Sequence, residues 1–196
     1  MPRTAEQFAN IRQERKEEIL QVALRLFGEK GYEATSIDMI AKTANISKGL
    51  VYNYFENKQK LLETVLDMFF EKLGDTFKAL YDSAEPAEVI IRQMLYTLRD
   101  SMKADIEFWQ FYTRLSFQFT EYLKRQYGAE MGRWMHKVTA MMEELRFANP
   151  QIEAIKLGSI IDGICINYIL APKFYPIDEV IENVADGFET QRADPR

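Results

Sequence analysis

The sequence is poor in the residues that build metal and redox sites. Its 196 residues include one cysteine, Cys165, and one histidine, His136. One cysteine cannot form an internal disulfide, and these two residues cannot supply the four ligands of a structural zinc site. A disulfide framework is therefore excluded, and the cysteine usage fits a reducing compartment. We expect no metal and no cofactor.

Long hydrophobic runs are also missing. The longest largely apolar stretch, residues 160–171, contains Asp162 and Asn167 and falls well short of the about 20 residues of a membrane-spanning helix. The first 18 residues are polar and lack the apolar segment of a secretory signal. These absences predict a cytoplasmic protein.

Catalytic motifs are absent as well. The sequence has no glycine-rich phosphate loop, no metal-ligand spacing and no residue pattern that pairs a nucleophile with a base. Hydrophobic residues make up 47% of the chain, which is ordinary for a globular protein. We therefore expect a folded binding protein and not an enzyme.

Charge is distributed unevenly along the chain. The net charge is −5, yet residues 1–60 hold ten basic and eight acidic side chains, which leaves that segment at +2. Residues 41–60 contain four lysines and one acidic residue, Glu56. A local basic patch can attract phosphate even on an acidic protein, because more distant charges are screened.

Apolar periodicity predicts an all-α fold of about nine helices. The expected helices cover about 8–30, 35–44, 47–55, 57–83, 86–102, 105–119, 121–147, 150–171 and 178–189. We interpret residues 1–56 as a three-helix helix-turn-helix domain and 57–196 as a helical regulatory and dimerisation domain. In the first domain, Thr35 is expected to cap the second helix and Ser47 the third, while Asn45 suits a turn with positive φ. In the second domain, Asp178 is expected to cap the last helix.

The third expected helix, within the stretch ISKGLVYNYF, has an unusual outward face. Val51 and Phe55 share one face by their i, i+4 spacing, and Asn53 lies opposite them. Glycine, leucine and two tyrosines flank the asparagine. Asparagine can bond bidentately to adenine in the DNA major groove, and leucine can meet a thymine methyl group. This face therefore predicts DNA recognition.

Residues 15–62, above all GYEATSIDMIAKTANISKGLVYNYFENKQKLL, resemble the DNA-binding domain of the TetR family of bacterial transcriptional regulators. The resemblance implies an all-α homodimer that binds double-stranded operator DNA, often with a small-molecule pocket. It departs from the family pattern at Asn45, where glycine is usual, and at Gln59, where an acidic residue is frequent. The DNA-binding positions it implies are Thr35, Ser36, Ser47, Lys48, Gly49, Leu50, Tyr52, Asn53, Tyr54 and Lys58. Tyr52 could instead serve chiefly to pack the domain.

The second domain carries a dense aromatic cluster. Eight of the chain's 25 aromatic residues fall between Phe108 and Tyr127, followed by a methionine-containing stripe. Such a cluster suits either a plain core or an apolar pocket. The candidate ligand-binding residues are Phe108, Trp109, Tyr112, Arg114, Met131, Met135, Asp162, Asn167 and Tyr168. We expect Asp162 to be buried, either in a structural ion pair or as an anchor for a basic ligand.

The helix near 150–171 is apolar nearly all round, so a second copy of the chain is expected to cover part of it. The candidate dimer residues are Ile160, Ile164, Ile181, Val184 and Phe188. Two functions remain open. The chain is either a repressor released from its operator by a small apolar or aromatic effector, or a DNA-bound interaction protein without an effector.

Overall fold

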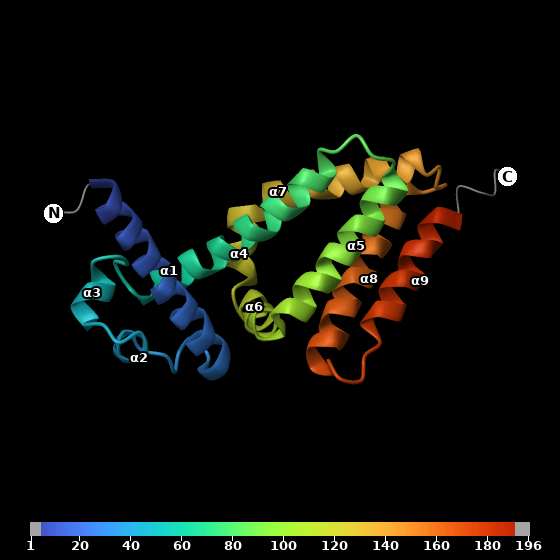
Figure 1. The fold of residues 1–196 in the computed structure, drawn as a ribbon. Helices are drawn as coiled ribbons and strands as arrows, with labels where there is room; N and C mark the ends of the chain where they lie inside the picture. The colour runs from blue at the N-terminus through green and yellow to red at the C-terminus, as the bar shows by residue number, and fades with distance from the viewer. Residues whose placement is uncertain (1–4, 191–196) are drawn as a thin grey trace. The chain divides into compact units, whose positions relative to one another are not determined.

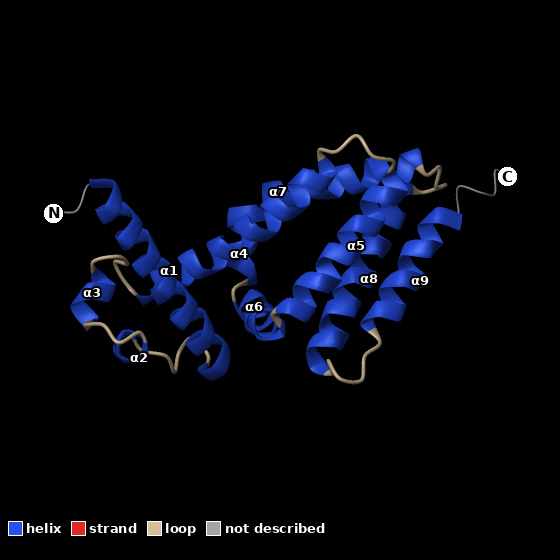
Figure 2. Ribbon diagram, viewed as in Figure 1, coloured by secondary structure: helices blue, strands red, loops and turns tan. Residues whose placement is uncertain are grey.

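The structure of the protein is a computed structural model that describes residues 5–190. Within that range it contains nine helices and no strand (Figures 1 and 2). The helices are α1 (Ala5–Lys30), α2 (Ile37–Thr43), α3 (Lys48–Tyr52), α4 (Lys58–Tyr81), α5 (Ala87–Ala104), α6 (Ile106–Gln118), α7 (Thr120–Glu144), α8 (Pro150–Leu170) and α9 (Ile177–Thr190). The predicted all-α class is confirmed.

The described residues form two compact units. The first consists of residues 5–73 together with 110–119, and the second of residues 74–109 together with 120–190. Helix α4 therefore contributes to both units, and its residues divide between 73 and 74. The predicted boundary between a helix-turn-helix domain (1–56) and a regulatory domain (57–196) is a functional division, and it stays a prediction.

The first unit is built around the C-terminal half of α1. Ile19, Ala23 and Phe27 are fully buried there. They pack with apolar side chains from three later segments, namely Ile37, Ile40, Ala41, Val51, Phe55, Leu61, Leu62, Val65 and Leu66. Each fully buried aliphatic or aromatic side chain contributes about 1.5–3 kcal/mol. This core fixes α2 against α1 and α3 against α2 (Figure 1).

Two residues with positive φ turn the chain in the first unit. Gly31 (φ 84) ends α1, as its position in the sequence predicts. Asn45 (φ 53) follows α2, where its N–H donates to Lys42 O at 3.1 Å and the next N–H, of Ile46, donates to Ala41 O at 2.9 Å. This pair of hydrogen bonds is a Schellman motif, so the predicted role of Asn45 in the turn is confirmed.

Two predicted helix starts are wrong. Ser36, not Thr35, caps α2, because the Ser36 hydroxyl accepts a hydrogen bond from Met39 N at 3.2 Å. Asp178 lies inside the first turn of α9 and does not cap it. Its carboxylate instead accepts a hydrogen bond from Lys103 of α5.

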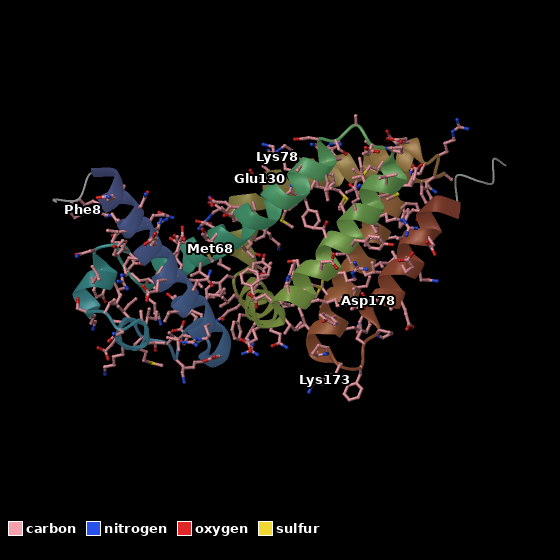
Figure 3. The ribbon with its side chains drawn as sticks, in the orientation of Figure 1. Phe8, Met68, Lys78, Glu130, Lys173 and Asp178 are labelled. Atoms are coloured by element: carbon pink, nitrogen blue, oxygen red, sulfur yellow. The ribbon has the colours of Figure 1, made fainter. Side chains whose placement is uncertain are left out.

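In the second unit α9 packs along α5 (Figure 1). Ile177, Ile181 and Ala185 of α9 are buried. The rim of this contact is charged: Arg92 bonds to Glu182 at 3.1 Å and to Asp186 at 2.6 Å, and Lys103 bonds to Asp178 at 2.8 Å. Figure 3 labels Asp178 on α9. The hydrogen bond from Lys103 lowers the pKa of Asp178. The apolar face of α9 is therefore buried within the protomer, against α5.

Candidate nucleic-acid interface

The exposed face of the helix-turn-helix lies on α3 and the residues beside it. Ser47 caps α3, since its hydroxyl accepts a hydrogen bond from Leu50 N at 3.1 Å. The helix is short, and Asn53 follows it with αR geometry, so the helical turn continues through that residue. The predicted orientation is confirmed: Asn53 is exposed, whereas Val51 and Phe55 are buried.

The other α3 positions also present a surface suited to a groove. Ser47, Lys48, Gly49 and Tyr52 are exposed, and Leu50 and Tyr54 are half-buried. A β-carbon built on Gly49 meets no atom within 4 Å, so this backbone is open to close approach. One short segment therefore offers an amide, a hydroxyl, a cation and bare backbone to a partner.

Thr35 differs from its predicted role. Its side chain is 1% exposed, and its hydroxyl lies 3.0 Å from Leu26 O and 2.9 Å from Gly31 O. The hydroxyl is thus committed to the end of α1 and is not presented to a phosphate. Ser36 next to it is exposed and keeps its hydroxyl proton available as a donor.

Lys58 also points into the first unit. Its Nζ donates to Tyr32 O at 2.9 Å and to Thr35 O at 3.1 Å, and it lies 4.2 Å from the centroid of the Tyr32 ring. The ammonium group therefore ties the start of α4 to the segment between α1 and α2. Sequence reasoning missed this role because the bonded carbonyls lie more than 20 residues away. Its phosphate contact stays a prediction.

Replacing Lys58 by alanine is expected to destabilise the protein by about 2 kcal/mol, because two charge-assisted hydrogen bonds are lost. The Lys60→Ala variant is the control. Lys60 is exposed and pairs only three residues along the helix, with Glu63 at 3.3 Å, a contact that contributes less than about 0.5 kcal/mol. Urea unfolding followed by circular dichroism measures both. Equal stability losses in the two variants would contradict the structural role.

Residues 19–65 match the model of a family described as bacterial regulatory proteins, tetR family. This match covers the core of the helix-turn-helix and all of its exposed face. These residues therefore form a DNA-binding domain of the TetR family.

The chain is similar to several members of this family. It is 34% identical over 70 residues to the transcriptional repressor KstR2 of Mycolicibacterium smegmatis, covering 36% of this chain and 34% of KstR2. The chain spans less than half the length of the curated relatives it matches. A TetR-like regulator from Rhodococcus sp. RHA1 has the same fold, with a TM-score of 0.73, 18% identity and coverage of 98% and 96% of the two chains. A regulator from Saccharomonospora viridis, in complex with choline, matches with a TM-score of 0.69, 19% identity and coverage of 90% and 96%.

The predicted ligand residues fall in both compact units. Tyr112 and Arg114 belong to the first unit. There the Tyr112 ring lies 6.0 Å from that of Phe70, burial raises the Tyr112 pKa to about 12, and Arg114 donates to Gly28 O. The other seven belong to the second unit, so the structure does not bring all nine together in one unit. A shared pocket stays a prediction.

Within the second unit the predicted ligand residues differ in exposure. Trp109 and Tyr168 are buried, and Trp109 Nε1 lies 3.2 Å from Ser101 Oγ, whereas Phe108 is half-buried. Met131 and Met135 on α7 are exposed, as is Asn167, whose amide donates to Gly163 O at 2.7 Å.

Asp162 corrects a prediction. It lies on the exposed side of α8 and not in a buried ion pair. Desolvation by its surroundings still raises the pKa of its carboxyl group. Within residues 5–190 no group of three or more histidine, cysteine, aspartate or glutamate side chains could hold a metal ion. None of the helices in this range is long and apolar enough to cross a membrane.

The predicted dimer residues are mostly used inside the protomer. Ile164 and Ile181 are buried, Val184 and Phe188 are half-buried, and the Phe188 ring lies 6.1 Å from that of Phe147. Because α9 packs its apolar side against α5, these residues have internal partners. Ile160 is exposed, together with Ile152, Ile155, Ile166 and Leu170 of the same helix.

Proposed function

We propose that the protein is a sequence-specific transcriptional repressor that binds operator DNA through α3. The observation that carries the proposal is the exposed Ser47–Asn53 face within the segment that matches the TetR family. Asn53 is proposed to read a base edge, while Ser36, Ser47 and Lys48 contact phosphates. A protein in this role is not an enzyme, and in a bacterium it acts in the cytoplasm, where the DNA lies.

Replacing Asn53 by alanine is expected to lower discrimination by about 1–3 kcal/mol at one base pair of each half-site, because the amide's paired hydrogen bonds to the base are lost. The operator is first selected from random DNA, and binding is then titrated against single-base variants. The Asn183→Ala variant, at an exposed asparagine of α9, is the matched control. Unchanged discrimination in Asn53→Ala would remove α3 as the reading element.

We further propose that the protein acts as a homodimer through the exposed face of α8. Two copies present two α3 segments, which must reach successive major grooves about 34–36 Å apart. At 100° per residue, the apolar residues Ile152, Ile155, Ile166 and Leu170 fall within about 60° of one another on one side of α8, as a helix-packing face requires. This proposed interface replaces the predicted dimer residues Ile164 and Ile181, which are buried within the protomer.

A small apolar or aromatic effector is proposed to release the repressor. The same fold from Saccharomonospora viridis is found with choline, which supports a small-molecule effector in general. The apolar or aromatic character is proposed because α7 exposes two methionines, which adapt to varied apolar ligands. Helix α4 is continuous from Lys58 to Tyr81 and contributes to both units, so it can transmit a shift of the second unit to the first. Gly74 lies in α4 where the two units divide, and it has the lowest helix propensity of the residues in this helix.

An effector is expected to change operator affinity about 5–150-fold, corresponding to a coupling of 1–3 kcal/mol. A thermal-shift screen is run on the free protein and on its operator complex. Because coupling is reciprocal, a true effector stabilises the free protein more than the complex. Compounds that stabilise both equally are not effectors. A broad screen without any effector would favour the alternative, a DNA-bound interaction protein.

A further inference from the structure

The first turns of α1 extend beyond the core of the first unit. Buried residues of this helix begin at Ile19, whereas every residue from 7 to 14 is exposed. Phe8 and Ile11 are 58% and 39% exposed, and Phe8 lies near the N-terminal end of the helix in Figure 3. This part of α1 contributes little to the core, so stability alone does not explain its composition.

Arg12, in this exposed part of α1, contacts the segment that follows α3. Its guanidinium carbon lies 5.4 Å from the centroid of the Tyr54 ring, and the Tyr54 ring lies 6.4 Å from that of Phe55. Phe55 is buried, so Tyr54 is held against the core on one side and against Arg12 on the other. Tyr54 directly follows Asn53, and Arg12 is therefore positioned at the edge of the exposed α3 face.

A ring holds a cation without neutralising its charge. Of three lysines near the α3 face, Lys42 and Lys60 instead pair with the carboxylates of Asp38 and Glu63, whereas Lys58 donates to two backbone carbonyls and lies over the Tyr32 ring. A cation–π contact leaves the N–H groups of the guanidinium available to donate to a phosphate. Arg12 thus combines a fixed position with a retained charge.

We propose that Arg12 binds a DNA backbone phosphate beside the bases that α3 reads, and that Tyr54 positions its guanidinium. The contact extends the DNA interface beyond the residues matched to the family, which begin at residue 19. This inference rests on the proposed DNA-binding function. Its partner is the phosphate backbone and not a base, because the guanidinium is anchored at the rim of the exposed face.

The test measures operator affinity as a function of salt concentration for the wild-type protein and four variants: Arg12→Gln, Tyr54→Leu, the double variant of these two, and Arg15→Gln. The slope of log K against log salt is negative, and Arg12→Gln is expected to make it shallower by about 0.9 for each lost contact, or about 1.8 per dimer. The base preference is expected to stay unchanged. In the Tyr54→Leu background, Arg12→Gln is expected to change the salt slope by less than it does in the wild-type protein, because the guanidinium is then no longer held in place. Arg15→Gln is the control, because Arg15 pairs with Glu18 on its own helix.

Thermal unfolding verifies that each variant is folded. If wild type binds its operator and Arg12→Gln has an unchanged slope, the inference is overturned and the proposed function stands. A changed base preference with an unchanged slope overturns it too, because Arg12 would then contact bases. If the wild-type protein selects no DNA sequence, the proposed function itself fails, and this inference fails with it.

Discussion

Replacing Ile166 by glutamate is expected to convert the protein to a 23.0 kDa monomer at micromolar concentration and to weaken operator binding strongly. Ile152, Ile155, Ile166 and Leu170 are 55%, 47%, 38% and 76% exposed and follow one side of α8. A homodimer that covers this stripe would bury a charge at residue 166 of each protomer. Burying an unpaired carboxylate costs several kcal/mol, so the dimer should weaken by two orders of magnitude or more.

The control for this variant is Asp162→Asn on the same stripe. Asp162 already has a raised pKa, and covering it in a dimer would raise the pKa further, so a dimer binds more protons than two monomers. The wild-type dimer should therefore strengthen as pH falls toward that pKa, and Asp162→Asn should be tighter at neutral pH and lose this dependence. Sedimentation equilibrium measures both variants. A wild-type-like dimer in Ile166→Glu would exclude this face as the interface.

Replacing Gly28 by alanine is expected to destabilise the first unit by about 1–3 kcal/mol, despite alanine's better helix propensity. A β-carbon at Gly28 would clash with the Cγ and Cβ atoms of Phe111. Helix α6 therefore approaches the backbone of α1 directly at this buried glycine, and Arg114 donates to its carbonyl. The clash involves the stem of the phenylalanine, so a change of rotamer cannot relieve it.

A double-mutant cycle tests this contact. Phe111→Ala would keep the clashing β-carbon of residue 111, so the partner substitution must be Phe111→Gly. In that background Gly28→Ala should cost much less than in wild type. Gly132→Ala is the control, because its β-carbon meets no atom within 4 Å, and it should stabilise α7 by up to about 1 kcal/mol. Denaturant unfolding of the four proteins of the cycle gives the coupling energy, and additive effects would refute the close approach.

Local chemistry was sufficient to predict the helices and the exposed face of α3. Each depends on residues that lie within one or two turns of each other: the hydroxyl of Ser47 near the N–H of Leu50, the positive φ tolerated by Asn45, and the i, i+4 pair of Val51 and Phe55. A second left-handed residue, Arg146 (φ 61), ends α7 and was not predicted. Arginine has no local preference for a positive φ, so the residue type at position 146 does not predict a left-handed turn there.

The sequence by itself determined the all-α class, the helix-turn-helix and the outward position of Asn53, because periodicity and capping act over a few residues. Only the tertiary structure decided which long-range partners each side chain has. It buried Thr35 beneath α1, turned Lys58 toward two distant carbonyls and closed α6 onto Gly28. It also placed Ile164 inside and Asp162 outside on α8. A helix that is apolar nearly all round does not specify its inward face, since that choice depends on helices distant in sequence.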